Sequence, residues 1–228
     1  MSKTAGRLLA AGNVAEVFEW GPRVVKLYRS PAAKQAAFRE AANHAAAEAM
    51  GLPVPAFWGV QRIDARWGIV FDRVKHASLA EQMRGDPTAM PHYLETLAAL
   101  QARIHAQPAS QFSSLKLRLA ANIARVNVLD EPRKRVLLTR LADPEGDRLC
   151  HGDFHPINVL GEVSRPVVID WPDACLVKIS DLTGTDLLPG PLFGGLLEFG
   201  HRNLPDTVAD EVAHRCGPLP PAFDRASA

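Results

Sequence analysis

The sequence predicts a globular α+β protein in which a β-rich first part is followed by a mostly helical second part. In residues 1–75, short apolar segments are separated by turn signals such as Gly12-Asn13. In residues 76–228, apolar side chains recur at helical spacing instead. We therefore expect two domains with these boundaries, of which the first is a five-stranded antiparallel sheet with one helix.

The composition fits a folded protein and argues against several other classes. Of the 228 residues, 47% are apolar and 22% are charged, a balance that is not typical of disorder. The net charge of +1 lacks the basic excess expected of a nucleic-acid or membrane-surface binder. No apolar run approaches the roughly 18 residues needed to span a bilayer, and no secretory signal is visible. We expect neither nucleic acid nor a membrane as a partner.

The cysteines indicate a reducing compartment. Cys150, Cys175 and Cys216 are odd in number and have no paired spacing. Reduced thiols are the simplest interpretation, because disulfides form and persist in oxidising compartments. We expect a cytoplasmic protein.

In the first part, five segments have the apolar content of strands and are separated by turns. The expected strands are 7–11, 15–20, 24–28, 57–63 and 67–74. Between the third and fourth strands the chain is Ala-rich, with Ser30 as a candidate N-cap, Pro31 at the first helical position and Gly51 as the stop. These signals predict a helix from residue 31 to residue 50.

In the second part, apolar spacing predicts three helices before a short β segment. The expected helices are 91–107, 114–129 and 131–142. A β segment follows at 149–171, and the Gly- and Pro-rich sequence after Asp181 gives no clear element. The catalytic groups are expected in the β segment, because it contains several polar residues at turn positions.

The segment 149–171 reads as a β-hairpin with carboxylates at its open end. Its first strand begins at Asn158, and its return strand ends at Asp170. In an antiparallel hairpin the start of one strand lies beside the end of the other, so these two side chains should meet. Asp153 lies on the loop that enters the same end. A carboxamide and two carboxylates are therefore expected to converge.

This set of oxygen ligands suits Mg²⁺, which prefers hard oxygen donors and completes its shell with phosphate oxygens and water. A free carboxylate next to such an ion can accept a proton from a substrate hydroxyl. Together these groups are the parts of a phosphoryl-transfer centre.

The spacing of these residues resembles a known family. His151-Gly152-Asp153, followed by Asn158 and by Ile169-Asp170-Trp171, is similar to the motifs of the aminoglycoside phosphotransferase and choline kinase group of protein-kinase-like enzymes. Upstream, AAGNVAEVFEWGPRVVKLYR, FREAANHAAAEAMGLPVP, GIVFDRV and LAALQARIHAQP resemble the first strands, first helix, hinge and Leu-rich helix of that family. The resemblance implies a bilobal fold with a short catalytic hairpin.

The resemblance also implies a role for each residue of the centre. Asp153 would orient the attacking hydroxyl and accept its proton. Asn158 and Asp170 would hold Mg²⁺ on the phosphates of the nucleotide. Lys26 would contact the α- and β-phosphates, and Glu40 would pair with Lys26.

The nucleotide would be held by loops of the first lobe. Gly12 and Asn13 occupy the turn that would cover the phosphates. Backbone groups of Asp72 and Val74 would bind the adenine edge, with Phe71 behind it. Two further residues, His151 and Asp181, would support the catalytic loop without taking part in the chemistry.

The predicted function is Mg²⁺-dependent transfer of the γ-phosphate of ATP or GTP to a hydroxyl of a small molecule. Aminoglycoside-, amino-alcohol- and sugar-like acceptors remain open. An alternative is a nucleotide-binding protein with little or no catalysis, because relatives continue with more helices after the segment that matches Asp181-Leu182-Thr183. A second alternative is a metal-dependent hydrolase with a transition metal held by Cys150, His151, Asp153 and His155.

Overall fold

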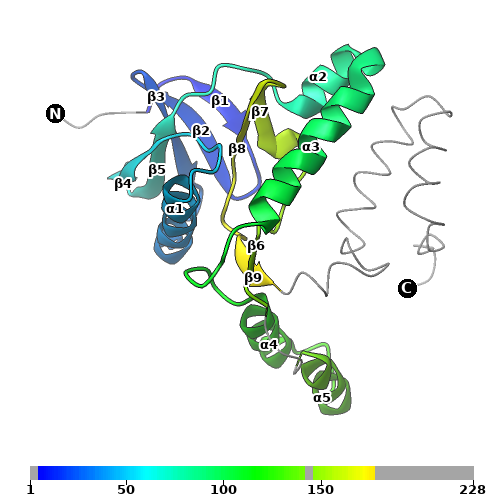
Figure 1. Cartoon of the computed structure of the whole chain (residues 1–228). Helices are drawn as coiled ribbons and strands as arrows, with labels where there is room; N and C mark the ends of the chain where they lie inside the picture. Colours follow the sequence, from blue (N-terminus) through cyan, green and yellow to red (C-terminus); the bar gives the residue numbers. More distant parts are fainter. Residues whose placement is uncertain (1–4, 142–145, 178–228) are drawn as a thin grey trace, which may run out of the picture.

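The computed structural model describes residues 5–141 and 146–177 (Figure 1). Its first part is a five-stranded antiparallel sheet with the order β1-β2-β3-β5-β4. The strands are β1 (Leu8–Ala11), β2 (Ala15–Trp20), β3 (Arg23–Tyr28), β4 (Phe57–Ile63) and β5 (Arg66–Asp72). One helix, α1 (Lys34–Ala49), packs against β4 and β5. The predicted sheet and helix are therefore confirmed, although β5 ends two residues before the expected strand.

The two faces of the sheet have separate apolar cores, because successive side chains of a strand point to opposite faces. Val25 and Leu27 of β3 belong to a cluster on one face. Tyr28 packs with Ala37 and Ala41 of α1 on the other face. The alternation places Lys26 on the face that α1 covers, so its side chain can reach polar groups of that helix.

Helix α1 ends as predicted but begins later than expected. Gly51 has a φ of +70°, and the amides of Gly51 and Leu52 donate to the carbonyls of Glu48 and Ala47, which closes the last turn. At the start, the amide of Ala33 donates to the carbonyl of Ser30. Ser30 is thus part of a turn that precedes the helix, and the prediction that it caps the helix was wrong.

The second part contains helices and two small sheets. The helices are α2 (Leu79–Gly85), α3 (Met90–His105), α4 (Leu115–Arg125) and α5 (Glu131–Arg140), with short 3₁₀ turns η1 (Pro87–Ala89) and η2 (Pro156–Asn158). The strands are β6 (Arg148–Cys150), β7 (Val159–Glu162), β8 (Arg165–Val168) and β9 (Cys175–Val177). Strand β6 pairs with β9, and β7 pairs with β8.

Sequence reasoning missed two of these elements and lengthened others. Helix α2 was missed although Ser78 and Glu81 have the spacing of a capping box, and it lies beside β7 (Figure 1). Strand β9 was missed because a three-residue strand has too few positions to show alternation. The helices predicted at 114–129 and 131–142 are present but shorter, with Ser114 and Asp130 as their N-caps.

The largest apolar core lies beneath α2 and α3 and extends to the hairpin. Leu97, Leu100 and Ile104 of α3 belong to it, together with Val168 of β8 and Trp171. The β7–β8 hairpin is thus anchored on this core, and the amide of Val168 donates to the carbonyl of Pro53 in the first part of the chain. The prediction of residue 75 as a domain boundary remains a prediction.

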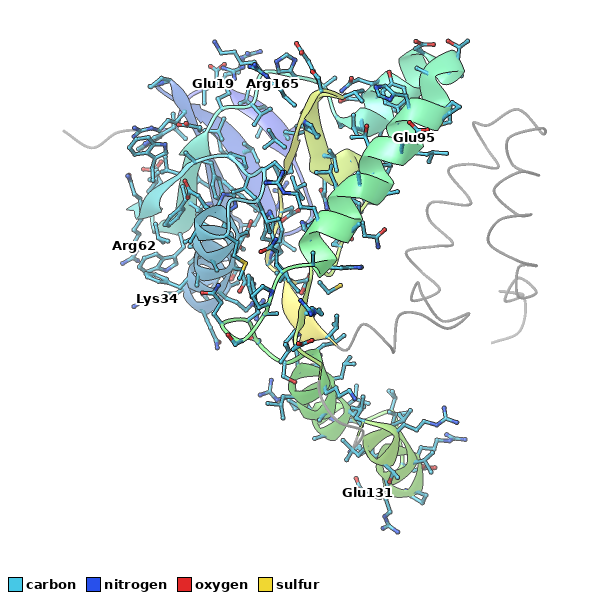
Figure 2. The ribbon with its side chains drawn as sticks, viewed as in Figure 1. Glu19, Lys34, Arg62, Glu95, Glu131 and Arg165 are labelled. Carbon is cyan, nitrogen blue, oxygen red and sulfur yellow. The ribbon has the colours of Figure 1, made fainter. Side chains whose placement is uncertain are left out.

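Helices α4 and α5 extend away from the rest of the described structure (Figure 1). They pack on each other, and none of their residues is buried among the described residues. Figure 2 shows Glu131, at the start of α5, at the opposite end of the molecule from Glu19 of β2. Within residues 5–141 and 146–177, no helix has the length and apolar character needed to cross a membrane.

Replacing Ser78 by Ala should lower the free energy of unfolding by about 1 kcal/mol, because both hydrogen bonds of the α2 capping box involve this residue and the replacement removes its oxygen. Urea denaturation measures the change. Ser30→Ala is the matched control, since its hydroxyl caps no helix, and it should have less than half the effect. An equal loss in both variants would contradict the helix start found here.

Candidate active site

The hairpin brings Asn158 and Asp170 together at its open end. Val159 pairs with Val168, and the amide of Ile169 donates to the carbonyl of Asn158 at 2.9 Å. Asp170 follows with a φ of +70°, a left-handed conformation that is uncommon for a residue other than glycine. Strand β8 itself ends at Val168, two residues before the expected end at Asp170.

His151 links the loop before the hairpin to the strand that follows it. Its Nδ1 accepts from the amide of Asp153 at 3.3 Å, and its Nε2 lies 3.1 Å from the carbonyl of Ile169. These partners fix the tautomer with the proton on Nε2. The ring is buried against Trp171, and this burial lowers the pKa of His151 below its ordinary value. A neutral ring that hydrogen-bonds two backbone groups is suited to hold the loop in place.

Asp153 is held by two side chains of the same loop. Asn158 Nδ2 donates to the carbonyl oxygen of Asp153 at 3.0 Å and approaches its Oδ2 at 3.3 Å. His155 Nε2 lies 3.5 Å from the same Oδ2. The hydrogen bond from His155 is the main reason that the pKa of Asp153 lies below its ordinary value, despite partial burial. Asp153 is therefore a partly exposed, ionised carboxylate with a fixed orientation.

Lys26 joins the two parts of the chain by an ion-pair bridge. Its Nζ lies 2.7 Å from Glu40 Oε1 on α1 and 2.5 Å from Asp170 Oδ1 after β8. Burial alone would lower the pKa of Lys26, but the two carboxylates outweigh it and raise the pKa above its ordinary value. Burial raises the pKa of Glu40, against the effect of Lys26. The site is thus a buried cation between two acids.

Asn43 is a residue of the site that sequence reasoning missed. Its Nδ2 donates to the carbonyl oxygens of Trp171, at 3.0 Å, and of Ala174, at 3.4 Å. Asn43 lies three residues after Glu40, on the same face of α1, and both are buried. A second polar residue on that face of an Ala-rich helix was the available signal. Helix α1 therefore holds both Lys26 and the segment after Asp170.

The residues expected to bind the nucleotide lie at the edges of the sheet. Gly12 and Asn13 form the turn between β1 and β2, with the Gly12 amide donating to the Ala15 carbonyl. Phe71 is buried, and its ring centroid lies 4.5 Å from that of His44. Asp72 ends β5, and its carboxylate accepts from the Trp58 indole at 2.7 Å.

The structure does not test the roles expected of Val74 and Asp181, and it disfavours the hydrolase alternative. Val74 follows β5 in a segment without regular structure, and Asp181 lies outside the described residues. The hydrolase alternative placed a metal on Cys150, His151, Asp153 and His155. Among residues 5–141 and 146–177, no group of three or more His, Cys, Asp or Glu side chains is placed to hold a metal. In addition, Cys150 lies opposite Cys175, and His151 binds backbone groups with both ring nitrogens.

Replacing Gly152 by Ala should destabilise the protein by about 3 kcal/mol, because the residue has a φ of +86° and a Cβ would collide with the backbone carbonyl of Asp173. Gly21→Ala is the control, since Gly21 has a φ of +63° and open space around its Cβ position. It should cost about 1 kcal/mol. Urea denaturation of both variants separates backbone strain from collision, and equal losses would contradict the close packing at Gly152.

Several solved structures have the same fold as this chain. An aminoglycoside phosphotransferase, APH(3'')-Id from Streptomyces rimosus, aligns with a TM-score of 0.60 at 20% identity over 96% of this chain and 87% of its own. An aminoglycoside-3'-phosphotransferase of type VIII aligns with a TM-score of 0.55 at 19% identity over 96% and 90%. A thermostable APH(4)-Ia variant in a ternary complex with ADP and hygromycin B gives 0.55 at 19% over 78% and 70%.

These likenesses confirm the predicted bilobal, protein-kinase-like α+β fold. No curated protein matches the sequence. A family profile, however, matches residues 13–178, most of the chain, including strands β2 to β5, α1 and the whole β7–β8 hairpin. Apart from residues 10–12, the residues that carry the resemblance lie within this match. The chain therefore belongs to the phosphotransferase enzyme family (APH).

Proposed function

We propose that this phosphotransferase moves the γ-phosphate of ATP to a hydroxyl group of a small molecule. The observation that carries the proposal is the convergence of Lys26, Glu40 and Asp170 beside the Asp153–Asn158 loop. Lys26 and Asp170 are separated by 144 residues in the sequence and by 2.5 Å in the structure. A buried bridge between lobes, next to a free carboxylate, is the arrangement that phosphoryl transfer requires.

Lys26 is the cation of the proposed nucleotide site. In the present arrangement its single positive charge is paired with two carboxylates, Glu40 and Asp170. With Asp170 holding a metal ion, Lys26 would stay paired with Glu40 and its remaining N–H groups could bind phosphate oxygens. The Gly12-Asn13 turn and the backbone of Asp72 and Val74 complete the nucleotide site in this proposal. The relatives support it, since their structures contain ADP or AMP-PNP.

The donor set also fits Mg²⁺. Asn158 turns its NH₂ group to Asp153, which leaves the carboxamide oxygen as the atom able to face a cation. Asp170 already has a cation, the Lys26 ammonium, at its Oδ1. Both donors are the hard oxygens that Mg²⁺ selects. When bound, Mg²⁺ supplies the positive charge that offsets the negative charge of the phosphates.

Asp153 is the proposed catalytic residue. Its ionised carboxylate accepts a hydrogen bond from the acceptor hydroxyl and so points a lone pair of the hydroxyl oxygen at the γ-phosphorus. The oxygen–phosphorus bond forms as the bond to the ADP leaving group breaks, and the hydroxyl proton passes to Asp153. His155 and Asn158 hold the carboxylate in place, while His151 keeps the loop backbone in register. Asp181 is proposed as a further brace.

The proposed acceptor is an aminoglycoside-, amino-alcohol- or sugar-like alcohol. The relatives support this range, because one was solved with ADP and streptomycin and another with ADP and hygromycin B. In this proposal residues 1–75 bind the nucleotide and residues 76–228 provide the catalytic loop and the acceptor site.

Asp153→Asn should lower kcat for phosphoryl transfer at least about 100-fold, because the amide cannot accept the proton. The affinity for Mg²⁺–ADP, measured by calorimetry, should stay within a factor of about three of the wild-type value. Asp147→Asn is the matched control, because this aspartate is exposed and, among the described residues, its ion pair is with its neighbour Arg148. Wild-type turnover in Asp153→Asn would contradict its role.

A coupled ADP-release assay with Mg²⁺–ATP identifies the acceptor. We expect acceptor-dependent ADP release, with phosphorylated product by mass spectrometry, for at least one member of a panel of amino sugars, amino alcohols and sugars. Release should stop when EDTA removes Mg²⁺ and return when Mg²⁺ is restored. If Mg²⁺–ATP raises the melting temperature but no acceptor yields product, the chain is a nucleotide-binding protein and the proposed transfer is wrong.

A further inference from the structure

Tyr28 contacts the carboxylate that holds the active-site lysine. Its hydroxyl donates a hydrogen bond to Glu40 Oε2, while Glu40 Oε1 accepts from Lys26 at 2.7 Å. Tyr28 follows Lys26 by two residues on β3, so both side chains point to the face that α1 covers. Each oxygen of the buried carboxylate therefore has one donor, and both donors come from the same strand.

We propose that Tyr28 is a positioning residue for phosphoryl transfer, whose hydroxyl fixes the Glu40 carboxylate so that Glu40 holds Lys26 toward the nucleotide phosphates. This inference rests on the proposed function, because it concerns the work that Lys26 does there. Tyr28 itself touches neither nucleotide nor acceptor in this scheme. It acts only through Glu40.

The burial of Glu40 explains why a second donor is needed. Glu40 is 1% exposed, and a buried carboxylate is stable only when its oxygens are hydrogen-bonded or paired with charge. Lys26 alone satisfies one oxygen, and it is also attracted to Asp170 at 2.5 Å. With Oε2 left without its donor, the Glu40 side chain loses the contact that fixes its orientation. Lys26 is then held less firmly by Glu40 than by Asp170.

The hydroxyl of Tyr28 is held rigidly enough to do this. Its ring is buried among Ala37, Ala41 and Ile69 beneath α1. The only other acceptor near the hydroxyl in the described structure is the carbonyl of Ala36, at 3.4 Å, whereas the carboxylate is much closer and charged. Because a charged acceptor forms the stronger hydrogen bond, the single proton of the hydroxyl belongs to Glu40.

The bridge has a direct consequence for nucleotide binding. Asp170, which would hold the metal ion, competes with Glu40 for Lys26, and the ion pair with Glu40 is the contact that would keep Lys26 in place. A hydrogen bond to a charged group typically changes an equilibrium about tenfold or more. Loss of the Tyr28 hydroxyl is therefore expected to act on the nucleotide step and to leave the acceptor step unchanged.

The test is Tyr28→Phe, which keeps the buried ring and removes only the hydroxyl. We expect the Kd for Mg²⁺–ATP, measured by calorimetry, and the KM for ATP to rise about tenfold, with the KM for the acceptor unchanged. Tyr93→Phe is the matched control, because Tyr93 is the other tyrosine of the chain and its buried ring lies on α3. It should bind Mg²⁺–ATP as the wild type does.

A double-mutant cycle with Glu40→Gln separates positioning from a general effect on packing. If Tyr28 acts through Glu40, Tyr28→Phe adds less than about a twofold change to Glu40→Gln. A full tenfold loss in the Glu40→Gln background, or wild-type Mg²⁺–ATP affinity in Tyr28→Phe alone, overturns the inference. Melting temperatures of each variant confirm that the fold is kept.

Lys26→Ala distinguishes this failure from failure of the proposed function. If Lys26→Ala weakens Mg²⁺–ATP binding and Tyr28→Phe does not, only the role of Tyr28 is wrong. If Lys26→Ala also binds Mg²⁺–ATP normally, Lys26 is not part of the nucleotide site, and the proposed function and the inference both fail.

Discussion

The structure of the site depends on one buried ion-pair bridge, in which Lys26 lies between Glu40 and Asp170. Lys26 comes from the sheet, Glu40 from α1 and Asp170 from the hairpin of the second part. Of the three groups Glu40 is buried, so removing Lys26 would leave its carboxylate without a charged partner, which is costly inside a protein. The two ion pairs therefore help to hold the sheet, α1 and the hairpin in place relative to one another.

Neutral hydrogen bonds around the bridge hold the same elements in register. Asn43 binds the carbonyls of Trp171 and Ala174, and the amide of Val168 donates to the carbonyl of Pro53 at 2.7 Å. These contacts orient the hairpin on α1 and on the segment that follows it. Since they bind backbone atoms, they do not compete for charge with Lys26. In the proposed function the charged groups are thereby left available for a nucleotide and its metal ion.

Much of the fold could be predicted because the signals were local. The turn at Gly12-Asn13, the stop at Gly51 and the hairpin expected from Asn158 each depend on a few consecutive residues. The turn and the stop were found as expected, and the hairpin begins one residue later, at Val159. Helix α2 had a local signal in Ser78 and Glu81 that was overlooked. The start of α1 was misplaced because Ser30 and Pro31 suit a turn as well as a first helical turn.

The sequence by itself determined the kind of chemistry, because Asp153, Asn158 and Asp170 lie close together along the chain and their residue types restrict the ligands. Only the tertiary structure decided how distant residues complete the site. Asn43 and Tyr28 look like ordinary helix and strand residues until folding brings α1 onto the sheet and against the hairpin. Their contacts arise from packing between elements, and the spacing of residues along one chain carries no record of that packing.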